Sequence, residues 1–100
     1  MAKYDVFGDP RGTDNLLVVV QDEMFESFDT RLAIPLLPEH PKRIPLKRLN
    51  PIFLIGDRKY VLYTQHMLAV PKHVLKQPLA NLREMRDDIT TAVDFLLQGF

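Results

Sequence analysis

The spacing of apolar residues changes once along this 100-residue chain, near residue 81. From there on, apolar residues recur every three or four positions, which places them on one stripe of a helix. The stripe consists of Leu82, Met85, Ile89, Ala92, Val93 and Leu96. Asn81 is a suitable N-cap, Glu84 can return a bond to that cap, and Gly99 stands where a left-handed residue commonly ends a helix. The sequence therefore predicts one helix, at the C-terminal end.

Up to that point the chain is typical of short strands separated by turns. Apolar or alternating segments predict strands at residues 3–7, 16–21 and 30–37, a hairpin within 51–64 around Gly56-Asp57-Arg58, and short extended pieces at 67–71 and 73–75. The run LLVVV, residues 16–20, predicts a strand that is covered on both faces. Pro35 favours an edge strand or a bulge, and the five prolines from Pro35 to Pro51 favour a loop. We therefore predict a mainly β protein with one C-terminal α-helix, built as a small antiparallel β-barrel or curled sheet.

Length and composition limit the class of protein. A chain of 100 residues, 46% of them hydrophobic, suits one domain over residues 1–100, and so short a chain often associates with itself to gain stability. Cysteine, a membrane-length apolar run and a signal-peptide core are all missing from the sequence, so we expect a cytoplasmic protein with no membrane partner. Because the formal net charge is zero, we expect no direct binding of nucleic acid by this protein alone.

Three large apolar residues near the chain end do not belong to the helix stripe. Phe95 and Leu97 point away from it on either side, and Phe100 follows the helix. A single exposed apolar residue needs no explanation, but three together favour a surface that contacts a partner.

Residue patterns that carry catalysis or metal binding are missing from the sequence. The histidines His40, His66 and His73 lack ligand spacing, the one serine, Ser27, is not in a nucleophile motif, and there is no phosphate-binding loop. The basic stretch PKRIPLKR, residues 41–48, lacks an interleaved aromatic residue and is interpreted as a solvated loop. We therefore expect no metal and no cofactor, and a binding module rather than an enzyme.

One enzymatic alternative stays open at this point. A metal-free ribonuclease needs only a cation, a base and a positioned histidine or aspartate, and Arg31, His66 and Asp57 supply those residue types. Nothing in the sequence places the three together.

Three stretches of the chain together resemble the CcdB family. They are VVVQDEMFESFDTRLAIPLLP at residues 18–38, NPIFLIGDRKYVLYTQHMLAVP at residues 50–71, and the terminal helix LREMRDDITTAVDFLLQGF. Their order and spacing cover nearly the whole chain without large gaps. The resemblance implies an SH3-like barrel with a small extra sheet and a C-terminal helix.

The resemblance also implies a function and partners. CcdB-like proteins are homodimeric toxins of toxin–antitoxin modules; they poison DNA gyrase by trapping its A subunit on cleaved DNA, and a disordered segment of the antitoxin CcdA neutralises them. Carried over by position, the gyrase-binding residues are Met24, Phe25, Asp94, Leu97, Gln98, Gly99 and Phe100. We further expect Leu96 and the LLVVV strand to lie at the dimer interface.

The chain departs from the family pattern at its end. The best-known member has Trp where this chain has Gln98, and Ile where it has Phe100. Two alternatives therefore accompany the gyrase poison: a CcdB-fold protein that binds an antitoxin without poisoning, and a ribonuclease toxin of the MazF/Kid type.

Overall fold

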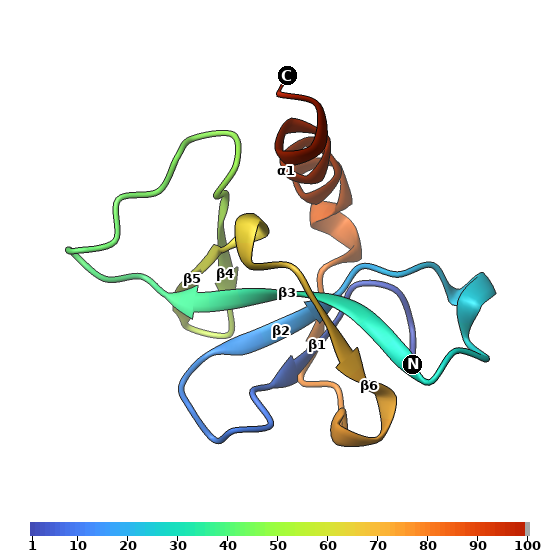
Figure 1. Ribbon diagram of the computed structural model, residues 1–100. Coiled ribbons are helices and arrows are strands. Elements are labelled where there is room, and N and C mark those ends of the chain that lie inside the picture. The colour runs from blue at the N-terminus through green and yellow to red at the C-terminus, as the bar shows by residue number, and fades with distance from the viewer. Residues whose placement is uncertain (100) are drawn as a thin grey trace.

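The computed structural model describes residues 1–99, and its elements follow one another in the order that the apolar pattern predicts (Figure 1). The seven strands are β1 (Asp5–Gly8), β2 (Leu16–Val19), β3 (Thr30–Pro38), β4 (Ile52–Ile55), β5 (Arg58–Leu62), β6 (Leu68–Pro71) and β7 (Ala80–Asn81). Short 3₁₀ turns occupy Glu23–Phe25, Thr64–His66, Lys72–Val74 and Arg83–Met85, and the helix α1 spans Arg86–Gln98.

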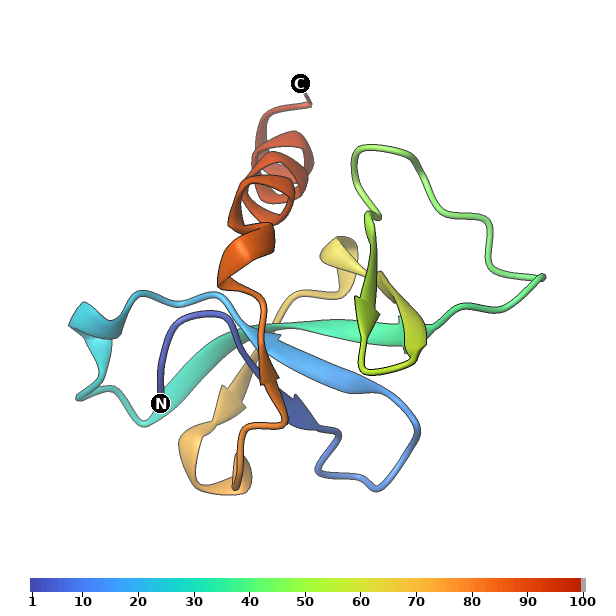
Figure 2. The ribbon, with the colours of Figure 1, turned by 180° about the vertical axis from the view of Figure 1, so that it is seen from behind.

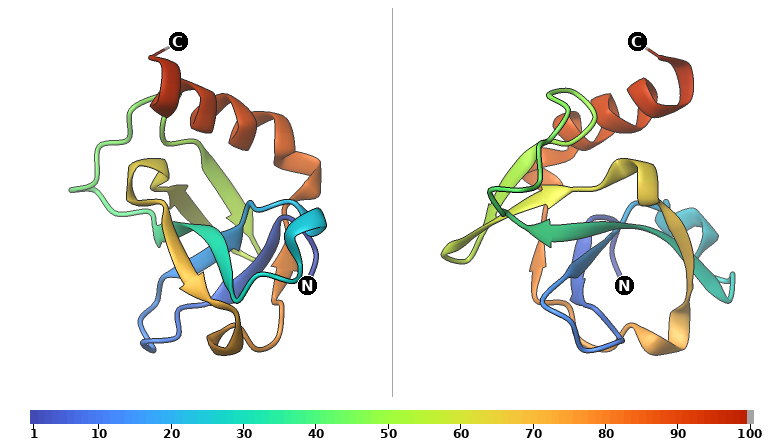
Figure 3. Two further views of the ribbon diagram at one scale, coloured as in Figure 1. Left: turned by 45° about the vertical axis from the view of Figure 1, so that its right-hand side comes forward. Right: turned by 60° about the vertical axis from the view of Figure 1, so that its left-hand side comes forward.

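All strand pairs are antiparallel and form one strongly curled sheet in the order β4-β5-β3-β2-β1-β7. The central strand β3, which is nine residues long, pairs with β6 along its first half and with β5 along its last three residues. The strands thus wrap into a nearly closed barrel, and α1 stands over one end of it (Figures 2 and 3). This architecture confirms the predicted fold class.

Pro35 lies in the middle of β3, so the expectation of an edge strand was wrong. The Tyr63 N–H donates to the Pro35 carbonyl at 2.9 Å, so the backbone nitrogen and carbonyl of Pro35 face away from β2. On that side, β6 pairs with residues 30–33 and β5 with residues 36–38, and Pro35 falls between the two partners. Its missing N–H therefore removes no bond to β2 and falls where the other side of the strand changes partner, which is why a central strand tolerates this proline.

Strand β2 is buried on both faces by residues of its own chain. Leu16 and Val18 belong to one apolar cluster, which includes Ile89 of α1. Leu17 and Val19 belong to a second, smaller cluster with Phe7, Ala33, Val70 and Leu75. The predicted two-sided burial is confirmed, but no partner is needed to explain it. The strand exposes little side-chain surface within one chain, and its place at a dimer interface stays a prediction.

The helix begins later than its sequence stripe suggests. Asn81 still pairs with Asp5 in the β1–β7 ladder, and the Leu82 N–H donates to the Tyr4 carbonyl at 2.9 Å. The Asn81 side chain accepts a bond from the Arg83 N–H at 2.8 Å, in the 3₁₀ turn Arg83–Met85, and the residue before α1 is Met85. Strand pairing with a segment far away in sequence has overridden the local capping signal.

Of the remaining local predictions, two are confirmed and one is wrong. The hairpin turn at Gly56-Asp57 is confirmed, with Ile55 opposite Arg58 and a positive φ of 65° at Gly56. The extended piece predicted at residues 73–75 is instead mostly the 3₁₀ turn Lys72–Val74. Gly99 has a φ of 78° and its N–H donates to the Phe95 carbonyl at 2.8 Å, so it ends the helix as predicted.

Candidate functional site

The end of α1 stands clear of the barrel. Ile89 and Ala92 anchor the helix in the larger core cluster, whereas Leu97 is 73% exposed and Gln98 and Gly99 are also exposed. We call Asp94, Leu97, Gln98 and Gly99 the helix tip. Phe100, the remaining predicted contact of this end, lies outside the described residues.

Phe95 differs from the exposed contact residue that the sequence predicts. The guanidinium carbon of Arg48, from the proline-rich loop, lies 5.0 Å from the centre of the Phe95 ring. A guanidinium at this distance over an aromatic face is attracted to the ring and covers it. Phe95 is therefore half-buried and serves to hold the loop against the helix, and Leu97 is the exposed apolar side chain of the helix tip.

A second apolar surface lies on the segment between β2 and β3. Residues 22–29, with sequence DEMFESFD, form what we call the acidic turn. Met24 is 80% exposed and Phe25 is 42% exposed, so neither is a core residue within this chain. Phe28, which the sequence reasoning missed, is 54% exposed, and its ring centre lies 5.5 Å from that of Phe25. The signal for Phe28 was available in the sequence: a third large apolar residue in a segment that is otherwise polar.

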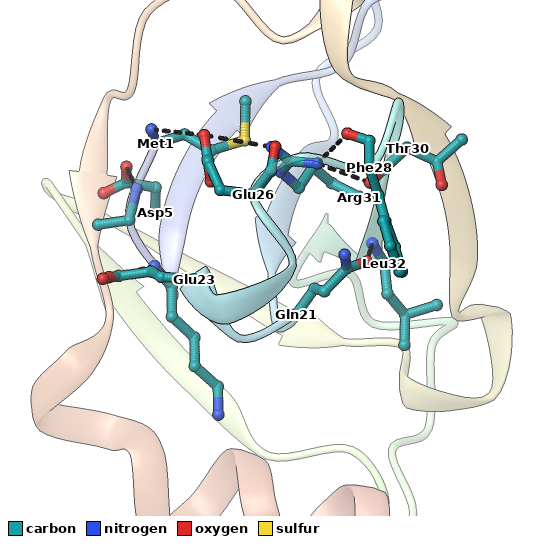
Figure 4. Close-up of polar contacts among 11 residues, drawn as sticks. Met1, Asp5, Gln21, Glu23, Glu26, Phe28, Thr30, Arg31 and Leu32 are labelled. Atoms are coloured by element: carbon teal, nitrogen blue, oxygen red, sulfur yellow. Dashed lines mark hydrogen bonds and ion pairs between the residues drawn. The ribbon is translucent and has the colours of Figure 1, made fainter.

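The acidic turn is held by Arg31, which is only 2% exposed and binds the turn's backbone carbonyls (Figure 4). One guanidinium nitrogen donates to the Phe28 carbonyl at 2.6 Å and the Thr30 carbonyl at 2.8 Å. The other donates to the Glu26 carbonyl at 2.6 Å and lies 3.2 Å from the Glu26 carboxylate. A buried charge is stable only when its donors are satisfied, and the turn's own carbonyls satisfy this one. Arg31 thus fixes the path of the backbone from Glu26 to Thr30.

Further polar contacts fix the first half of the turn. Asp22 accepts a bond from the Met24 N–H at 2.8 Å, and Glu23 accepts one from the Lys3 N–H at 3.1 Å. The hydrogen bond from Arg31 lowers the pKa of Glu26 below its ordinary value, and the amino group of Met1, 3.5 Å away, acts in the same direction. The turn is therefore a structured platform, although most of its side chains are exposed.

The two surfaces lie at different places on one protomer. The acidic turn and the β4–β5 hairpin occupy opposite sides of the barrel, and α1 rises between them to its free end (Figures 1 and 3). Arg83 and Arg86, before and at the start of α1, line a hollow together with Asp22 and Glu23. From Arg86 to Gln98 the helix rises about 18 Å, so its tip lies well beyond the turn. Asp94, which is exposed, lies lower on the helix than Leu97 and lines a smaller hollow with Val20, Leu32 and Met67.

The residue set considered for a ribonuclease is not assembled. Arg31 lies at the start of β3 and is used by the acidic turn, whereas β5 pairs with the other end of β3 and Asp57 precedes β5. At about 3.3 Å per residue, Arg31 and Asp57 are separated by roughly 20 Å or more along the strand. His66 packs its ring against Tyr63, with centres 5.2 Å apart.

Residues 1–99 contain neither a metal-binding cluster nor a membrane-spanning helix. No group of three or more histidine, aspartate or glutamate side chains within these residues is placed to hold a metal ion. Within the same residues, no helix has the length and apolar character required to cross a membrane.

The fold and its surfaces define the class: a small mainly β barrel, with a C-terminal helix and an acidic turn that expose apolar side chains. The family model described as the CcdB protein matches residues 3–99, which is nearly the whole chain. The chain therefore belongs to the CcdB family of toxins, the toxic components of toxin–antitoxin systems.

Proposed function

We propose that this protein inhibits a bacterial type II topoisomerase, the A subunit of DNA gyrase, by trapping the enzyme on cleaved DNA. In this proposal it is the toxin of a type II toxin–antitoxin module, acts in the cytoplasm, and is not itself an enzyme. The observation that carries the proposal is the exposure of Leu97 at an ordered helix tip, together with Met24 and Phe25 on the acidic turn. These are positions that the family resemblance associates with gyrase.

The proposal includes a homodimer with Leu96 at or near its interface. Leu96 is 38% exposed although it continues the stripe that Ile89 and Ala92 bury, so part of the stripe is left uncovered within one chain. A two-fold dimer that covers Leu96 brings two helix tips together, which suits a two-fold target. A CcdA-like antitoxin with a disordered binding segment is the proposed second partner.

The test is a cleavage-trapping assay. Purified protein is incubated with gyrase and supercoiled plasmid, the reaction is stopped with detergent, and linear DNA is measured. We expect the natural protein to trap linear DNA and Leu97→Asp to lose this activity, because a carboxylate replaces an apolar contact. Leu54→Ala, at an exposed leucine of β4, is the matched control and should trap as much as the natural protein. Absence of trapping by the natural protein contradicts the proposal.

A second candidate is a protein of this fold that binds an antitoxin and does not poison. Gln98 favours it, since this position of the helix tip carries Trp in the best-known family member, and a stacking residue is lost. Gln98→Trp separates the two candidates. Trapping by the natural protein supports the first candidate, and trapping by the Gln98→Trp form alone supports the second.

A further inference from the structure

We propose that Phe28 is a third contact residue of the acidic turn, positioned by Arg31, and that Met24, Phe25 and Phe28 together enter an apolar hollow on the target that is rimmed by basic side chains. The inference rests on the proposed function, because it takes the gyrase A subunit as the target.

The first argument is that Phe28 is exposed and yet ordered. Its ring is 54% exposed, but its carbonyl accepts a bond from Arg31 at 2.6 Å and its N–H donates to the Phe25 carbonyl at 3.0 Å. A residue whose backbone is already fixed loses less conformational entropy when a partner buries its ring, and aromatic anchors dominate many interfaces.

The second argument is that the two rings form one surface. Phe25 and Phe28 lie with ring centres 5.5 Å apart and planes inclined by 36°, and the 80% exposed Met24 directly precedes Phe25. Three large apolar side chains within five residues make an apolar knob larger than the scattered single residues normal on a protein surface. A contact that buries Phe25 would also have to bury or displace the adjoining face of Phe28.

The third argument is charge, which specifies the kind of hollow. Four carboxylates, those of Asp22, Glu23, Glu26 and Asp29, belong to the segment that carries the knob, and residues 22–29 contain no lysine or arginine. The charge of Glu26 is offset by Arg31 and by the amino group of Met1. Arg31 beneath the turn is buried, and Arg83 and Arg86 face Asp22 and Glu23 from the helix side. With Glu26 paired, the carboxylates of Asp22, Glu23 and Asp29 give the turn its negative charge beside the apolar side chains, which is complementary to an apolar hollow with a basic rim and repels a phosphate backbone.

The experiment measures binding of the full-length protein to the purified gyrase A subunit by biolayer interferometry, with melting temperature as a folding check. We expect Phe28→Ala to weaken binding by about tenfold, while its melting temperature stays close to that of the natural protein. Phe28→Leu should retain part of the affinity, and Leu54→Ala, an exposed leucine on β4, should retain all of it. Unchanged binding by Phe28→Ala overturns the inference and leaves the proposed function standing. No binding by the natural protein overturns both.

Two further measurements test the role of Arg31 and the basic rim proposed on the target. Arg31→Lys keeps the positive charge but cannot donate to three carbonyls in the fork geometry of a guanidinium. If Arg31 positions the knob, the folded Arg31→Lys protein binds more weakly than the natural protein; if its role is only structural, the melting temperature falls and the affinity of the folded protein does not. Affinity should decrease as salt increases, and Asp29→Asn should reduce that salt dependence. A salt-independent affinity contradicts the basic rim.

Discussion

The guanidinium of Arg48 lies over the face of Phe95, 5.0 Å from the ring centre, and so connects the proline-rich loop to the last third of α1. The loop between β3 and β4 contains no strand or helix of its own, and this contact adds to the hydrogen bonds that order it, such as those from Arg43 to the Pro38 carbonyl and from Thr64 to the Leu49 carbonyl. It also gives the helix, which otherwise rises free of the barrel, a lateral support below its tip.

Removing that support should destabilise the helix end slightly. Arg48→Ala uncovers the Phe95 ring and should cost about 0.5–1 kcal/mol, the usual size of an exposed cation–π contact. The free energy of unfolding in urea measures the cost, and hydrogen exchange of the last turn of α1 locates it. Arg48→Lys is the control, because it keeps a cation and should lose less. Equal stability of all three proteins would show that the contact contributes nothing.

The ion pair of Glu26 with Arg31 predicts a pH dependence of stability. The pKa of Glu26 in the folded protein lies below its ordinary value of 4.5, mainly because Arg31 donates to its carboxylate. Its contribution is therefore fully present above the unfolded pKa and is lost as the pH falls through the lower, folded pKa. Unfolding measured from pH 6 to pH 3 on the natural protein and on Glu26→Gln should show a stability difference that is constant above about pH 5 and shrinks below it. A difference that grows on acidification contradicts the assignment.

Leu96 and Leu97 are neighbours in sequence and form a matched pair of test positions. We expect Leu96→Asp to give a monomer or an unfolded chain, because a carboxylate would be buried at the proposed interface without a partner. Leu97→Asp, at a more exposed position, should keep the dimer and lose only the target contact. Sedimentation velocity reads the oligomeric state. A stable dimer of the Leu96→Asp protein would remove Leu96 from the interface.

Deletion of residues 98–100 tests the helix tip as a whole. The last buried residue of α1 is Ala92, and Gly99 supplies the C-terminal cap, so within the described residues the deletion removes a cap and no core side chain. We expect a stability cost of about 0.5–1.5 kcal/mol and loss of cleavage trapping. The truncated protein must be shown to fold by its melting curve. A truncated, folded protein that traps as much DNA as the full chain would exclude the tip as the poisoning element.

The features that could be predicted from the sequence are those that depend on neighbouring residues. The helical stripe, the Gly56-Asp57 turn and the Gly99 cap each follow from a few adjacent positions. Leu97 was found because a large apolar side chain stood outside the helical stripe, whereas Met24 and Phe25 were assigned through the resemblance to the CcdB family; all three are exposed.

The features that were missed depend on distant segments. The start of α1 is delayed because Asn81 pairs with Asp5, and the ring of Phe95 is covered because Arg48 folds onto it. The sequence offered Arg31 as the cation of a possible ribonuclease, whereas in the structure its guanidinium donates to backbone carbonyls of the acidic turn. Tyr4 has a φ of 73°, a left-handed conformation that is rare for a bulky residue. The residues around Tyr4 in the sequence do not predict this conformation.

The position of Pro35 between two partners has a consequence for how the barrel opens. Because β3 pairs with β2 along one edge and with β6 and then β5 along the other, every large part of the sheet is joined through this one strand. Neither the β4–β5 hairpin nor the β1–β2 pair can leave without breaking bonds to it. The amides of Ile34 and Leu36, opposite Val18 and Leu16, should therefore exchange with solvent only when the whole domain unfolds, so that the barrel behaves as a single cooperative unit.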